Sequence, residues 1–71
     1  MLKISLKAAR VNAGLSQKEV AKALGVSNKT VHCWENGITS PRAEYIDALC
    51  ALYGVSYDDL NFLPNDSLKE N

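Results

Sequence analysis

Two short helical patterns lie side by side in residues 16–37, and only a short turn separates them. The run reads SQKEVAKALGVSNKTVHCWENG. Ser16 and Ser27 stand where a helix N-cap would precede each pattern, and Gly25 and Gly37 come after each pattern where a left-handed residue ends a helix. Two short helices joined by so short a turn are expected to cross at a steep angle, as in a helix-turn-helix.

The second pattern carries polar groups on the side that would face away from a core. At about 100° per residue, Ser27, Val31 and Trp34 fall on one arc, with Glu35 at its edge. Solvated helix faces usually carry Glu and Lys, whereas the opposite arc here holds groups suited to contacts with base edges. That arc consists of Asn28, Lys29, His32, Cys33 and Asn36. We interpret the run as a helix-turn-helix and expect the chain to bind DNA.

Serines and glycines predict the other helix boundaries as well. Serines precede four segments whose apolar residues recur with helical spacing, and glycines follow the ends of four such segments. A further helix is introduced by Ser40-Pro41, because proline is tolerated in the first turn of a helix. No segment alternates with period two for long enough to be a strand. The prediction is an all-α fold, a compact five-helix bundle with helices at 5–13, 16–24, 27–36, 42–53 and 56–62. One domain spans 1–63, and a polar tail covers 64–71.

The apolar positions of these segments are expected to converge on one core. Ala21 is small at the point where two helices must approach closely. Trp34 fits the core better than a contact surface, although its indole N–H needs a partner. The expected core residues are Leu6, Ala9, Ala13, Val20, Ala21, Leu24, Val31, Trp34, Ile46, Leu49, Cys50, Tyr53, Leu60 and Leu63.

Charge is distributed unevenly along the chain, although the formal net charge is zero. Residues 1–42 hold seven Lys and Arg against two acidic residues, a net charge of +5, and residues 43–71 hold one against six, a net charge of −5. The basic half contains the polar-faced helix. Such asymmetry favours nucleic-acid contact over a chance scatter of surface charge.

Composition and motifs argue against several other classes. With 46% hydrophobic and 23% charged residues the chain is typical of a soluble globular domain. It has no apolar stretch of about 20 residues for a membrane and no secretory signal, so we expect a cytoplasmic protein. Cys33 and Cys50 form no C-x-x-C pair, and one histidine cannot build a metal site, so neither a metal nor a cofactor is expected. Without a paired-carboxylate, nucleophile–base or phosphate-loop motif, we expect no enzyme.

The motifs together resemble a known family. The run GLSQKEVAKALGVSNKTVHCWENG, then Pro41, then GVSYDDL, is similar to the Cro and phage-repressor type of helix-turn-helix domain over residues 5–63. Cys33 departs from the pattern, because the family more often has a larger polar residue there. The resemblance implies a bacterial or phage-encoded homodimer that binds a (pseudo)palindromic operator in double-stranded DNA, mostly as a transcriptional repressor.

The resemblance also implies roles for individual residues. Gln17 resembles a glutamine that clamps a phosphate and supports the recognition helix, and Arg10 and Glu35 match an internal ion pair between the first and third helices. His32 is equally consistent with an idle surface histidine, and Cys33 is better explained as a spectator at the groove edge than as a base contact. The expected DNA-binding residues are Gln17, Ser27, Asn28, Lys29, Thr30, His32, Cys33, Asn36, Thr39 and Arg42.

The sequence leaves two questions open: whether the partner is DNA or a protein, and whether two copies act together. A helix-turn-helix domain can bind a protein instead of DNA through the same face, as an interaction module or an antitoxin-type partner; a large exposed apolar patch would favour that use. If DNA is the target, one helix reads too few base pairs for a specific site, so a homodimer is expected. Tyr57, Phe62 and Leu63 are the candidates for its interface.

Overall fold

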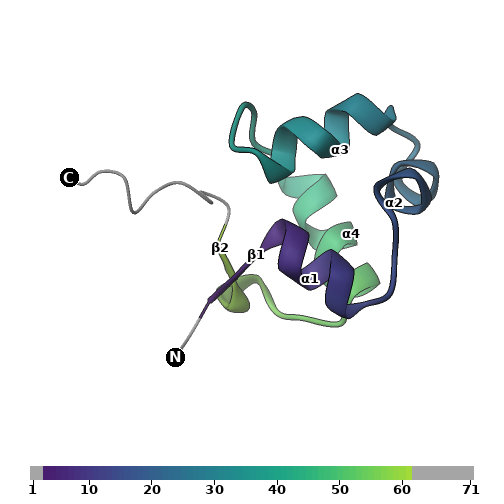
Figure 1. Ribbon diagram of the computed structural model, residues 1–71. Helices are drawn as coiled ribbons and strands as arrows, with labels where there is room; N and C mark the ends of the chain where they lie inside the picture. The colour runs from purple at the N-terminus through teal and green to yellow at the C-terminus, as the bar shows by residue number, and fades with distance from the viewer. Residues whose placement is uncertain (1–2, 62–71) are drawn as a thin grey trace.

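The computed structural model describes residues 3–61. Within them the chain forms four α-helices, one 3-10 turn and two strands of two residues each. In chain order these are β1 (Ile4–Ser5), α1 (Leu6–Asn12), α2 (Gln17–Leu24), α3 (Asn28–Glu35), α4 (Ala43–Tyr53), η1 (Tyr57–Asp59) and β2 (Leu60–Asn61). In Figure 1, α3 lies above α1, α4 passes between them, and α2 is seen end-on at one side. None of the described helices has the length and apolar character needed to cross a membrane.

Serine caps decide where the first three helices begin. The side chains of Ser5, Ser16 and Ser27 each accept a hydrogen bond, 3.0–3.1 Å long, from the backbone N–H three residues later. At Ser16 the backbone N–H also donates to Glu19 Oε1 at 2.8 Å, which completes a capping box. The predicted starts of these helices are confirmed to within one residue. The predicted start of α4 is also confirmed to within one residue, with Arg42 as the N-cap; the buried Pro41 precedes this cap and does not lie in the first turn.

The prediction of a fifth helix at 56–62 is wrong, and so is the prediction that the chain has no strand. Ser56 does begin a turn, since its N–H and hydroxyl both donate to Asp59 Oδ2 at 3.2 and 2.9 Å. The turn ends after three residues because Leu60 extends into the core, where it is 2% exposed. Its backbone pairs in parallel with that of Ile4, which places β2 beside β1. The predicted class, an all-α helix-turn-helix fold, is confirmed by the four helices, but the predicted number of five helices is not.

Nine buried apolar residues form the core of the described part of the chain, and all nine were predicted. The prediction for Ala13 is wrong: it is the exposed C-cap of α1, beyond the last helical turn. Tyr45 was missed; it packs on Trp34 with ring centroids 5.4 Å apart. Leu63, Phe62 and the predicted tail lie outside the described residues. The core consists of Leu6, Ala9, Val20, Ala21, Val31, Trp34, Leu49, Tyr53 and Leu60, with Leu24 and Cys50 among the half-buried residues packed against it.

Candidate nucleic-acid interface

A buried ion pair fixes α3 against α1. Arg10 Nε lies 2.6 Å from Glu35 Oε2, and Arg10 Nη2 donates to Glu35 Oε1 at 3.3 Å. The Glu35 side chain is 2% exposed and the Arg10 side chain 11%. Arg10 Nη1 also donates to the carbonyl oxygen of Leu15 at 2.8 Å. One guanidinium therefore joins α1, the segment leading into α2, and the C-terminal end of α3.

Gln17, the first residue of α2, adds a third donor to the same carboxylate. Its Nε2 donates to Glu35 Oε1 at 2.9 Å, and because an amide nitrogen carries two hydrogens, the second is left for another acceptor. The hydrogen bond to Glu35 raises the pKa of Arg10 above its ordinary value. Burial raises the pKa of Tyr53 on α4 to about 12, and the charge of Glu35 adds to this shift. Groups from the other three helices thus interact with the one buried carboxylate on α3.

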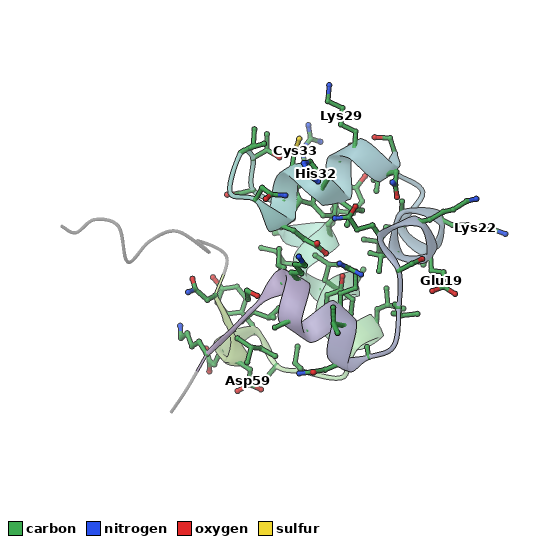
Figure 2. The ribbon with its side chains drawn as sticks, viewed as in Figure 1. Glu19, Lys22, Lys29, His32, Cys33 and Asp59 are labelled. Atoms are coloured by element: carbon green, nitrogen blue, oxygen red, sulfur yellow. The ribbon has the colours of Figure 1, made fainter. Side chains whose placement is uncertain are left out.

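The exposed side of α3 presents the predicted polar residues together. Asn28, Lys29, His32 and Asn36 are exposed and Cys33 is half-buried. Figure 2 shows Lys29 and Cys33 projecting from the side of α3 that points away from α1, with His32 close to them. The core-facing side of the same helix holds Val31, Trp34 and Glu35, all buried. An eight-residue helix therefore separates a core face from a polar face, as its periodicity predicts.

Asn36 determines which hydrogen-bonding group His32 presents. Asn36 Nδ2 donates to the carbonyl oxygen of His32 at 2.8 Å and lies 3.3 Å from His32 Nδ1. Because this amide nitrogen can only donate, Nδ1 of the neutral ring must be the acceptor, and the ring hydrogen then lies on Nε2. The exposed imidazole therefore offers an N–H donor. In the major groove such a donor matches purine N7 or guanine O6.

The remaining predicted residues lie around this face. Ser27 Oγ caps α3 and lies 2.9 Å from Thr30 Oγ1, so these two hydroxyls bond to each other. Thr39 and Arg42 are exposed and line a pocket with Thr30 and Trp34, whereas Gln17 contacts α3 at Glu35. Tyr57 is 60% exposed on η1.

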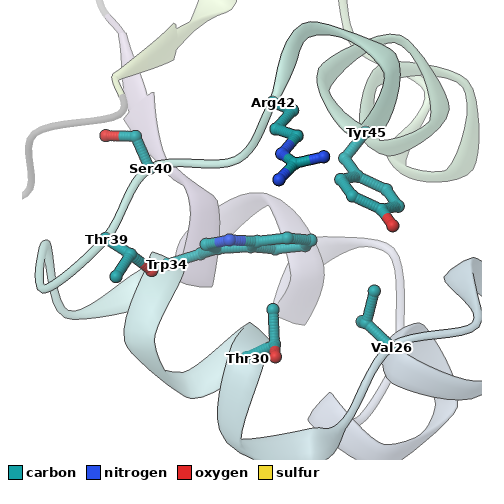
Figure 3. A pocket seen from close by; sticks show the side chains of 7 residues that line it. All are labelled: Val26, Thr30, Trp34, Thr39, Ser40, Arg42 and Tyr45. Carbon is teal, nitrogen blue, oxygen red and sulfur yellow. The ribbon is translucent and has the colours of Figure 1, made fainter.

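Two pocket or network groups were missed in the sequence analysis. The carbonyl oxygen of Leu15 accepts from Arg10, and Tyr45 lines the pocket beside Trp34 (Figure 3). Helical periodicity cannot find them, because a backbone acceptor has no residue signature and the pocket forms only when the segment after α3 meets α4.

Comparison with known proteins gives consistent matches. The helix-turn-helix family model matches residues 6–60. The antitoxin PezA of Streptococcus pneumoniae serotype 4 is 35% identical over 60 residues, covering 84% of this chain and 38% of that protein. The cryptic phage CTXphi transcriptional repressor RstR of Vibrio cholerae is also 35% identical over 60 residues, covering 84% of this chain and 54% of the repressor. The chain thus spans about half or less of the length of these curated relatives. No solved structure matches it.

Proposed function

The chain belongs to the helix-turn-helix family, and from this premise we propose that it is a DNA-binding transcriptional regulator that represses by occupying an operator. The observation that carries the proposal is the polar outer face of α3 on a helix whose inner face is held by a buried ion pair. A rigidly held helix with short polar groups on its outer side fits the DNA major groove. The repressor relative supports the same use.

Each group on this face has a distinct task in the proposed complex. Asn28 can bond in bidentate fashion to adenine, and Lys29 can donate to guanine O6 and N7. His32 supplies the Nε2–H donor that its contact with Asn36 leaves free. Gln17 uses its second amide hydrogen on a backbone phosphate, at a helix N-terminus that already favours an anion. Base contacts then specify the sequence, and the phosphate contact sets the position of the helix.

A salt titration with duplex DNA of random sequence tests the proposal. We expect the logarithm of the binding constant to fall linearly with the logarithm of the salt concentration, because bound phosphates release counterions. Fluorescence anisotropy of a labelled duplex measures this slope. Lack of binding even at low salt would contradict a DNA-binding function.

We propose further that two copies bind one operator. One α3 reads only a few base pairs, and two half-sites about 34 Å apart would supply the missing specificity. Tyr57, 60% exposed, is the interface candidate within the described residues; Phe62 and Leu63 remain candidates from the sequence. The mass of the saturated complex on a selected operator is expected to correspond to two chains per duplex. A complex with one chain per duplex would exclude the dimer.

The antitoxin relative favours a second candidate function, in which the domain binds a partner protein. The described part of the α3 face gives this candidate less support, because its exposed residues are polar and an interaction patch would be more apolar. If the chain fails to bind DNA but captures a protein through α3, this second function replaces the first.

A further inference from the structure

The side-chain amide of Asn36, at the end of α3, has its orientation fixed by a backbone group. Asn36 is the exposed C-cap of the helix, and its Nδ2 lies 2.8 Å from the carbonyl oxygen of His32. That oxygen can only accept a hydrogen bond, so the atom that faces it must be the amide nitrogen and not Oδ1. The same nitrogen lies 3.3 Å from Nδ1 of the His32 ring. One amide nitrogen therefore holds both the backbone and the imidazole of the residue one turn earlier.

This arrangement uses both hydrogens of the Asn36 amide. The nitrogen carries two hydrogens, and one is needed for the carbonyl oxygen of His32 and the other for Nδ1. The atom that Asn36 has left for a ligand is Oδ1, which can accept a hydrogen bond but cannot donate one. A DNA phosphate offers only acceptor oxygens, so this amide is poorly suited to hold a phosphate, although the sequence predicts Asn36 as a DNA-binding residue. The amide is better suited to act on its neighbour.

His32 carries the effect of this hydrogen bond to the outer face of α3. Its ring is exposed, and Figure 2 shows it close to Lys29 and Cys33. Within residues 3–61 the ring makes no other hydrogen bond, so Asn36 decides the tautomer. When Nδ1 accepts, the neutral ring keeps its hydrogen on Nε2. Such a donor matches purine N7, guanine O6 or thymine O4 in the major groove and conflicts with the amino groups of cytosine and adenine.

We propose that Asn36 is a positioning residue, which sets the base preference of His32 by fixing its tautomer and does not itself contact DNA. The inference rests on the proposed function, because base reading by α3 is its premise. It deepens that function at one position of the operator. His32, which the sequence leaves equally consistent with an idle surface residue, becomes a reader with one defined hydrogen-bonding group.

The single histidine of the chain allows the tautomer to be measured without DNA. Long-range ¹H–¹⁵N spectra distinguish a ring nitrogen that carries a hydrogen from one that does not, and alkaline pH keeps a histidine ring neutral. We expect the hydrogen on Nε2 in the parent. In Asn36→Asp the side chain can only accept, so the hydrogen should move to Nδ1. Asn12→Ala, which removes an exposed asparagine at the end of α1, is the matched control and should keep the ring spectrum of the parent.

Selection of bound sequences from a random pool of duplexes then measures the base preference. Asn36→Ala leaves the ring free to turn and to exchange its hydrogen, so the preference at one base position should fall about two- to tenfold, the worth of one neutral hydrogen bond. In Asn36→Asp the exposed Nε2 becomes an acceptor, and the preference at this position should change toward the amino groups of cytosine or adenine. The added negative charge lowers affinity for all sequences alike, because phosphates carry no base information, so the preferred base can still be identified.

A double-variant comparison separates positioning from direct contact. If Asn36 acts through His32, replacing Asn36 with alanine should change the base preference of the parent but not that of His32→Ala. A change of equal size in both backgrounds would show a direct contact of Asn36 with DNA and would overturn the proposal. A ring that keeps its hydrogen on Nε2 in Asn36→Asp would overturn it as well. A parent that binds no duplex at low salt contradicts the proposed function and the base preference with it, whereas the tautomer change, measured without DNA, still confirms that Asn36 fixes the ring.

Discussion

Replacing Arg10 with alanine is expected to lower the free energy of unfolding by about 3–5 kcal/mol, the typical cost of removing one partner of a buried ion pair. The Glu35 carboxylate would stay buried, at 2% exposed, with Gln17 as its remaining side-chain donor. The carbonyl oxygen of Leu15 would lose its donor as well. Since small domains are stable by only about 5–15 kcal/mol, this loss would be a large fraction of the total stability. Urea denaturation followed by circular dichroism measures the change.

Two apolar variants separate lost packing from stranded charge. Arg10→Met restores volume but leaves Glu35 charged and buried, so its stability should lie between that of the alanine variant and the parent. The double variant Arg10→Met/Glu35→Leu removes both charges and is expected to approach the stability of the parent. Equal stability of all these variants would show that the ion pair does not hold α3 in place.

Local chemistry explains why the first three helices were predictable. A serine cap acts on a backbone N–H three residues later, so Ser5, Ser16 and Ser27 determine helix starts without help from distant parts of the chain. Ser56 carries the same signal with Asp59, and its turn does form. The conformation of the chain after that turn depends on Leu60, which pairs with a strand near the other end of the chain. No local pattern reports that pairing, and the fifth helix was therefore predicted where an extended segment lies.

In the candidate site, too, features set by local sequence could be predicted and features set by distant segments could not. Helical periodicity is enough to gather Asn28, Lys29 and His32 on one outer face, because all belong to one helix. The hydrogen bond between Asn36 and His32, by contrast, depends on rotamers at the helix end, and it decides which group the imidazole presents. The pocket beside Trp34 depends on how a separate segment meets α3. The sequence indicated only that the indole N–H needs a partner.

Asn28→Ala and Lys29→Ala are each expected to weaken binding to the preferred operator by about 1–3 kcal/mol and to relax the preference at one or two base positions. Both residues are exposed at the start of α3, on its outer face, where the helix would enter the major groove. Removing a base contact lowers affinity most for the preferred base, so competing sequences become more nearly equal. Selection of bound sequences from a random pool, together with affinity measurements on the selected sites, gives both quantities.

Gln17→Ala is the matched comparison, because its amide is placed to hold Glu35 and a phosphate rather than a base. It should weaken binding to all sequences by a similar factor and leave the selected sequence unchanged, since a phosphate contact carries no base information. Its effect on stability, measured separately, shows how much of the loss comes from a less firmly held α3. If Asn28→Ala and Lys29→Ala select the same sequence as the parent with undiminished preference, α3 does not read the bases. Its polar face is then better explained by the second candidate function, contact with a partner protein.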